Sequence, residues 1–208
     1  MKANSATRLI IVPEPHIKRT GPRKVGGEGE IEIFCADEQS DCSIDVSKCR
    51  QLAEEILRTQ GVRGSVELTL MFVPESTIAG LNEQYMNKAG STDVLAFPLD
   101  VVEAMHSPGP SAISRGPERP SLDLSDLPIL LGDVIVCPAV ANRQAQQHAG
   151  NFEDEIALLI CHGVLHVLGF DHDTEEKANI MQSRERELLE IHHWQATMPE
   201  SFRKVYEL

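Results

Sequence analysis

The segment HGVLHVLGFDH, residues 162–172, constrains the fold more than any other part of this 208-residue chain. His162 and His166 are four residues apart, so on a helix their imidazoles project from one face, one turn above the other. Gly169 can adopt the left-handed conformation that ends a helix, and such a turn brings His172 back to the same point. The spacing therefore predicts a helix that ends near Gly169 and three ring nitrogens that converge.

Three convergent imidazoles form a metal-ligand set. Imidazole suits zinc, copper, iron and nickel, and three histidines leave a fourth position for water or substrate, as in catalytic zinc sites. Zinc lowers the pKa of a bound water from 15.7 to about 7, which makes hydroxide available at neutral pH. A lone histidine on an apolar face is more often a core residue, but three in register indicate ligands. We therefore predict a hydrolase with one metal ion, Zn²⁺ or another divalent transition metal, held by His162, His166 and His172.

The residue after the first histidine separates this motif from peptidases with the same spacing. Metzincin peptidases carry a Glu there as general base, whereas this chain has Gly163. Loss of such a base removes a contribution of about 100- to 10,000-fold to the rate. Peptide hydrolysis is therefore disfavoured, although another acid can serve as the base. Each metal histidine usually needs a carboxylate or carbonyl on its second ring nitrogen, and Asp93, Asp133 and Asp171 are unranked candidates, with a helix cap or a surface acid as the alternative role of each.

Periodicity elsewhere in the chain predicts both strands and helices. Strands are expected over 30–35, 65–73, 93–97 and 131–137, and helices over 45–60, 75–85, 138–149, 151–169 and 174–191. Asp45, Asn151 and Thr174 are the expected N-caps of three of these helices. The pattern predicts an α+β fold in which a small mixed sheet of about four strands packs with helices, one of them a metzincin-like metal-bearing helix.

Composition suggests one folded unit with appendages. We expect a catalytic metal-binding domain over 29–191, interrupted by a loop rich in Pro, Ser and Gly at about 102–128. A basic extension, 1–28, precedes it and a C-terminal tail, 192–208, follows. The extension holds six Lys and Arg against two Glu, a net charge of +4. Since the whole chain has a net charge of −13, the remainder carries about −17. The negative charge of the folded unit argues against broad electrostatic attraction to RNA. The basic extension could contact nucleic acid, but we expect it to be a solvated tail.

The cysteines and the hydropathy bear on location. Five cysteines, odd in number and without a CxxC pair, fit reduced thiols in a cytosol. Cys161, next to His162, is expected as a buried packing residue. The apolar stretches fall short of the roughly 20 residues of a bilayer span, and we find no signal peptide. These features predict a cytoplasmic protein that makes no membrane contact.

The chain carries three motifs in order: LNEQYMNKAGSTDVLAFP at 81–98, LLGDVIVCP at 130–138 and HGVLHVLGFDH. They resemble the TDVLSFP block, the LGDI strand and the HGxLHLxGYDH segment of the YbeY family of bacterial metal-dependent endoribonucleases. The resemblance covers roughly residues 30–190. It implies an α+β fold, a single zinc ion and single-strand-specific endoribonuclease activity in ribosomal RNA maturation, at the 3′ end of 16S rRNA, and in ribosome quality control. The implied partners are ribosomal RNA and the small ribosomal subunit or its assembly factors.

One departure from the family concerns phosphate binding. Many members have an Arg directly after the Tyr of the first block, and here Tyr85 is followed by Met86. A cation beside the metal stabilises developing charge on a phosphoryl oxygen, so Lys88, Arg143 and the basic extension are candidate substitutes. For each of them a solvated surface charge is the alternative.

Several alternatives stay open at this point. We assign no general acid or base, because Asp171 and Asp173 suit a turn as well as proton transfer. The nucleophile is either activated water or the RNA 2′-hydroxyl. Two other functions compete: a metallopeptidase or small-molecule metallohydrolase with the same three histidines, and a non-catalytic ribosome-assembly factor in which the metal stabilises the fold.

Overall fold

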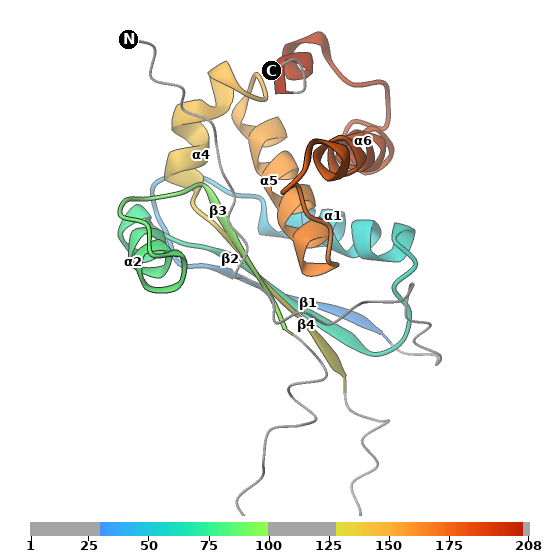
Figure 1. Ribbon diagram of the computed structural model, residues 1–208, viewed down its shortest axis with the longest axis horizontal. Helices are drawn as coiled ribbons and strands as arrows, with labels where there is room; N and C mark the ends of the chain where they lie inside the picture. The colour runs from blue at the N-terminus through green and yellow to red at the C-terminus, as the bar shows by residue number, and fades with distance from the viewer. Residues whose placement is uncertain (1–29, 100–127, 206–208) are drawn as a thin grey trace, which may run out of the picture.

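The computed structural model describes residues 30–99 and 128–205 (Figure 1). Its strands are β1 (Ile31–Asp37), β2 (Val66–Phe72), β3 (Val94–Pro98) and β4 (Ile129–Val136). Its α-helices are α1 (Val46–Thr59), α2 (Glu75–Met86), α4 (Pro138–Gln144), α5 (Phe152–Val167) and α6 (Glu175–His192), with short 3-10 helices η2 (Ala145–Gln147) and η3 (Glu200–Val205). The predicted α+β class with a four-stranded mixed sheet is confirmed.

The four strands form one sheet in the order β1-β2-β4-β3. β1 pairs with β2 and β2 with β4 in parallel, whereas β3 is antiparallel to β4 and forms one edge. Pro98 ends this edge strand, where a missing N–H costs no ladder hydrogen bond. Gly132 in β4 has φ +148°, and a Cβ there would lie 2.3 Å from the Phe97 carbonyl oxygen. Glycine at this position therefore allows the backbone of β3 to lie close to the backbone of β4.

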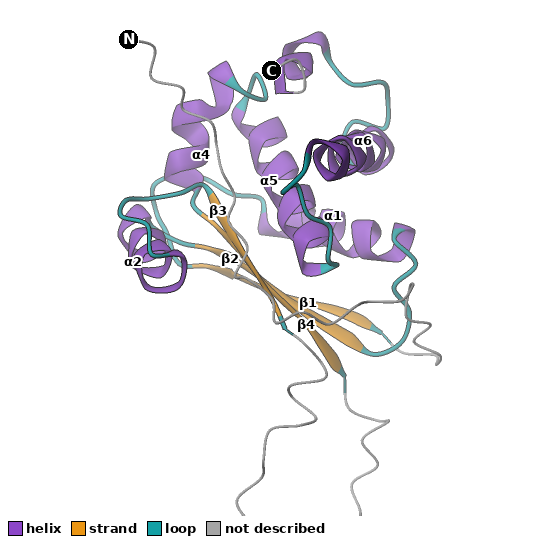
Figure 2. Cartoon of the chain, viewed as in Figure 1, coloured by secondary structure: helices purple, strands orange, loops and turns teal. Residues whose placement is uncertain are grey.

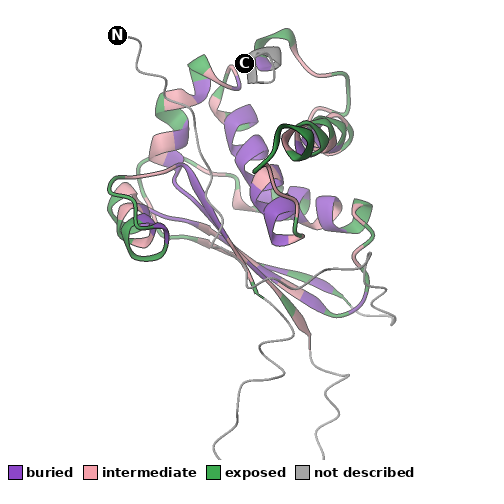
Figure 3. Ribbon diagram, viewed as in Figure 1, coloured by how far each residue is buried: buried purple, intermediate pink, exposed green. Residues whose placement is uncertain are grey.

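The helices cover both faces of the sheet unequally. Figures 1 and 2 show α1, α4, α5 and α6 on one face and α2 on the other. Alternate residues of β3 divide between the two cores: Val94 and Ala96 pack in the large cluster under α5, and Leu95 packs with Ile78 and Met86 of α2. Period-two alternation of a strand between two covered faces accounts for this division. Figure 3 shows α5 buried along most of its length, so α5 is the central helix of the larger layer.

Local capping explains where three helices begin. The side chains of Asp45, Asn151 and Thr174 accept hydrogen bonds from the backbone N–H three residues ahead, which satisfies donors that have no partner within the helix. Glu153 and Glu155 lie in the first turn of α5, where the helix dipole favours negative charge. All three predicted N-caps are confirmed.

Part of the segment that we expected as a C-terminal tail packs against the domain. Phe202 is buried in the main core, and Trp194 contacts it edge to face with ring centroids 4.7 Å apart. Ser201 lies so close to Gly150 that a Cβ on that glycine would be 2.7 Å from it. The basic extension 1–28 and all but the last residue of the loop 102–128 lie outside the described residues. None of the described helices has the length and apolar character that a membrane span requires.

Candidate metal centre

The first two histidines of the motif project from one side of α5. This side, which we call the histidine flank, carries Glu155, His162 and His166, whose spacings of seven and four residues place them in one line along a helix. Gly163 instead faces the sheet. A Cβ at this position would lie 2.5 Å from Cγ1 of Val134 in β4. The helix therefore lies so close to the sheet that the Glu of a metzincin has no room here.

A glycine turn ends α5 as predicted. Gly169 has φ +91°, its N–H donates to the His166 carbonyl at 2.8 Å, and the Phe170 N–H donates to the Leu165 carbonyl at 3.0 Å. This pair of bonds is the Schellman arrangement, in which the left-handed residue is nearly always glycine. The turn also aims the Phe170 carbonyl at the His166 ring, where it accepts from Nδ1 at 2.9 Å. Three residues beyond Gly169, the chain places His172 beside the other two histidines.

Glu185 of α6 orients the first histidine. Its carboxylate lies 2.5 Å from Nδ1 of His162, and the residue is only 3% exposed. Since a carboxylate and a carbonyl accept hydrogen bonds, both His162 and His166 carry their proton on Nδ1. Both therefore present the lone pair of Nε2, the usual state of a metal-ligating histidine whose other nitrogen is held by the protein.

The ring nitrogens that remain converge on one point. The two Nε2 atoms of His162 and His166 are 3.1 Å apart, and one nitrogen from each of the three histidines lies within 4.8 Å of the others. Zinc–nitrogen bonds of 2.0–2.1 Å in tetrahedral geometry place ligand nitrogens about 3.3 Å apart. The spacing, the all-nitrogen donor set and the tautomers all fit a transition-metal ion such as zinc.

The environment of His166 also suits a ligand. Its pKa is lowered to about 2, first by burial and then by the positive charges that His162 and His172 can carry, while the Phe170 carbonyl acts in the opposite direction. A histidine that resists protonation in this way keeps its neutral form, which is the form that binds metal ions.

His162 and His166 have the expected carboxylate and carbonyl partners, but none of the three candidate aspartates supplies them. Asp93 accepts from Thr92, the Val94 N–H and Gln144, and Asp171 accepts from the His172 backbone N–H. Within 30–99 and 128–205 no hydrogen bond joins Asp93, Asp133 or Asp171 to a metal-site ring. The sequence search missed Glu185, because it is 23 residues from His162 and only the packing of α6 on α5 brings the two together.

The candidate phosphate-binding cations differ in availability. Arg143 donates two hydrogen bonds to Glu75 at 2.7 and 2.8 Å, and these bonds, with one from Ser91, lower the pKa of Glu75 to about 2. Lys88 has no ion pair in the described part of the chain. Met86 stands where many members of the resembled family have an Arg. It is 8% exposed and packs in the smaller cluster, between the sheet and α2.

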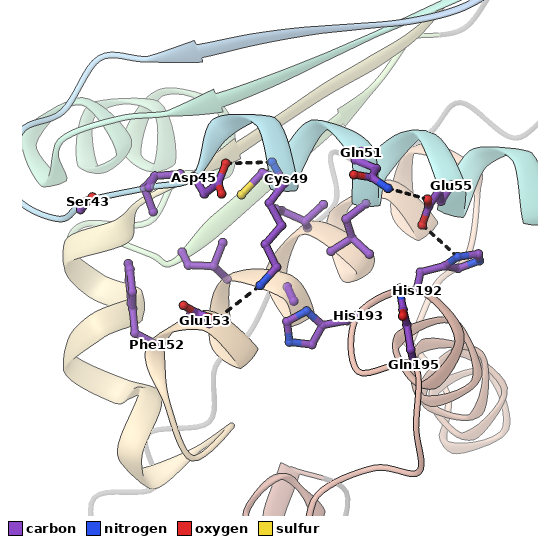
Figure 4. Close-up of a pocket in the computed structure, with 16 residues that line it drawn as sticks. Ser43, Asp45, Cys49, Gln51, Glu55, Phe152, Glu153, His192, His193 and Gln195 are labelled. Carbon is purple, nitrogen blue, oxygen red and sulfur yellow. Dashed lines mark hydrogen bonds and ion pairs between the residues drawn. The ribbon is translucent and has the colours of Figure 1, made fainter.

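The opposite side of α5, which we call the pocket flank, lines a pocket of about 330 Å³ together with α1 and the end of α6 (Figure 4). Glu55 of α1 bonds His192 Nδ1 at 3.1 Å, and Lys48 reaches Glu153 across the pocket at 3.4 Å. The pocket contains none of the three motif histidines.

Cys161, which faces neither flank, is fully buried, and burial raises the pKa of its thiol. All five cysteines are free.

The fold and the three-histidine cluster define a small α+β protein with a helix-borne candidate metal centre. The model of the family described as Endoribonuclease YbeY matches residues 34–193, and the chain belongs to this family. An Endoribonuclease YbeY from Nocardioides sp. is 38% identical over 159 residues, covering 76% of this chain and 95% of that protein. One from Thermobifida fusca is 38% identical over 151 residues, covering 73% and 88%. A solution structure of a Thermotoga maritima protein is 22% identical with a TM-score of 0.46, covering 79% and 92%.

Proposed function

We propose that this protein is a zinc-dependent endoribonuclease that cleaves single-stranded RNA during ribosomal RNA maturation and ribosome quality control. The observation that carries the proposal is the convergence of His162, His166 and His172 in a chain whose relatives are named endoribonucleases. Ribosomal RNA, with its 16S 3′ end as target, and the small ribosomal subunit or its assembly factors are the partners that membership of the family supports. Five free cysteines support a cytoplasmic location.

In this proposal the three histidines are the metal ligands and the surrounding residues orient them. Glu185 holds His162 and the Phe170 carbonyl holds His166, so both rings are set before substrate arrives. A bound zinc ion supplies a Lewis acid for the phosphodiester and lowers the pKa of water. Gly163 has no side chain, so the general base that a metzincin carries at this position is missing, which disfavours the peptidase alternative.

The same contacts argue against a metal whose only task is to hold the fold together. α5 is buried in the main core, its end is closed by the glycine turn, and its histidines have protein partners. Removal of the metal should therefore abolish cleavage and leave the chain folded. A chain that unfolded on chelation and never cut RNA would instead be an assembly factor with a structural metal.

The test combines metal analysis with cleavage of single-stranded RNA by the wild type, His162→Ala and His192→Ala. His192 is a matched control because it is also paired with a glutamate but lies on the pocket side. We expect one metal ion per chain and cleavage in the wild type and His192→Ala, and loss of both in His162→Ala. Equal cleavage by all three would reveal a contaminating nuclease and defeat the proposal.

A further inference from the structure

A second polar cluster extends the histidine flank toward the start of α5. Glu155 lies seven residues before His162 on the same side of the helix, which is about 10 Å along its axis. Its side chain is fully buried. A buried carboxylate is stable only when it is paired and hydrogen-bonded.

Four hydrogen bonds satisfy this carboxylate. Nδ1 of His148 lies 2.9 Å from both Glu155 oxygens, and the Ala149 N–H donates at 3.1 Å. The Gln144 amide donates at 3.0 Å and also donates to Asp93 at 2.6 Å. The cluster thus ties together α5, the last residue of α4, the two residues that follow η2 and the residue before β3. Its one titratable nitrogen donor is His148.

His148 presents one ring nitrogen that the protein does not use. Nδ1 donates to Glu155, whereas Nε2 has no hydrogen-bond partner among the residues described, and the side chain is 23% exposed. Burial lowers the pKa of His148, but the hydrogen bond and charge of Glu155 outweigh it, aided by the charges of Asp93 and Glu185, so the pKa is raised overall. The protonated ring therefore persists to higher pH, with Nε2–H free to donate.

His192, the last residue of α6, lines the pocket and shows a contrasting arrangement. It too is paired with a glutamate, since Nδ1 lies 3.1 Å from Glu55. Its Nε2, however, is 2.7 Å from the Thr59 hydroxyl. Both nitrogens of His192 are occupied within the protein, as expected of a structural histidine. His148 differs by its free nitrogen and by its place at the end of the histidine flank.

We propose that His148 is a substrate-binding residue, whose Nε2–H donates to a phosphate of the RNA strand next to the phosphate at the metal centre. The inference rests on the proposed function and adds a phosphate subsite to it. A hydrogen bond from an imidazolium to a phosphate is charge-assisted and therefore stronger than a neutral one. The buried Glu155 fixes the ring and its tautomer, so that little freedom is lost on binding.

The experiment measures the salt dependence of binding to a single-stranded RNA oligonucleotide, together with KM and kcat for its cleavage. For binding, His148→Gln, His148→Arg and His192→Gln are each compared with the parent in a His162→Ala background that does not cut the probe. Each phosphate contact contributes about 0.7 to the slope of log affinity against log salt for single strands. We expect His148→Gln to lower the slope by about that amount at pH 6 and to raise KM about 10-fold or more with kcat little changed.

The remaining variants separate binding from a loss of structure. His148→Arg keeps a cation and should retain most of the salt-dependence slope. Because Arg stays charged, this slope should not change with pH between 6 and 8.5. His192→Gln should match the parent throughout. An unchanged slope and KM in His148→Gln would overturn the inference alone. A wild-type protein that neither binds nor cuts single-stranded RNA would overturn the proposed function and the inference with it.

Discussion

The two flanks of α5 carry similar residue types in different settings. On the histidine flank, Glu155 is fully buried, and the carboxylate of Glu185 orients His162. On the pocket flank, Glu153 is 78% exposed and its contact to Lys48 is 3.4 Å long. Buried carboxylates with several donors hold one geometry, whereas exposed pairs exchange with water and are screened by salt. The comparison indicates that a carboxylate holds its partner in one geometry where burial and further contacts keep the carboxylate itself in place.

The largest effect should follow a change at the side of α5 that contacts the sheet. Gly163→Glu restores the metzincin residue but places its Cβ 2.5 Å from Val134, so we expect destabilisation of more than about 3 kcal/mol. Gly163→Ala should cost about 1–3 kcal/mol. Urea unfolding followed by circular dichroism measures both.

A matched control for this change lies in α2. Gly80 has nothing within 4 Å of its Cβ position, so Gly80→Ala should stabilise the protein by up to about 1 kcal/mol. Because Val134 is fully buried and its truncation is destabilising by itself, the test compares backgrounds: Gly163→Ala should cost less in a Val134→Ala background than in the wild type. If the two costs are equal, the close approach of α5 to β4 is not the reason for glycine at this position.

The next effect concerns the orientation of His162. Glu185→Gln removes the charge that holds Nδ1, and we expect metal affinity to fall about 10- to 100-fold without a change of fold. Competition with a chromophoric chelator measures the affinity. Glu153→Gln on the pocket flank is the counterpart and should leave it unaltered. Equal losses in the two variants would mean that overall charge, and not the Glu185 contact, controls metal binding.

A smaller effect should appear in the pH dependence of stability. The pKa of His148 is raised in the folded protein, so its protonation stabilises the fold fully below the unfolded value of about 6.5. That stabilisation is lost as pH rises through the folded pKa. The free energy of unfolding of the wild type should therefore exceed that of His148→Gln most at pH 6 and approach it by pH 9. A gap that widens with pH would show that the ring is neutral in its pair with Glu155.

The smallest effect belongs to the pocket flank. Lys48→Met removes an ion pair whose side chains are 56% and 78% exposed, and we expect a loss of at most about 1 kcal/mol that shrinks further in 0.5 M salt. Thermal unfolding at two salt concentrations measures it. A loss above about 2 kcal/mol would mean that this flank is as tightly held as the histidine flank.

Most elements of the fold could be predicted because their signals are local. A cap such as Asp45, the alternation of β2 and the glycine that ends α5 each act within a few residues of chain. The partner of His162 could not be predicted in the same way. Asp93, Asp133 and Asp171 were the candidates from the sequence, yet Glu185 reaches the ring from a different helix.

The histidine spacing with Gly169 was enough to predict three converging imidazoles, since one helix and one turn contain all the geometry involved. Tertiary structure decided what surrounds them. Val134 explains why Gly163 has no side chain, Glu185 sets the tautomer of His162, and Glu155 is placed beside His148. Except for the short link from His148 to Glu155, these contacts join segments more than 20 residues apart. They depend on how closely α5 packs against β4 and α6, and the order of residues along the chain does not specify that distance.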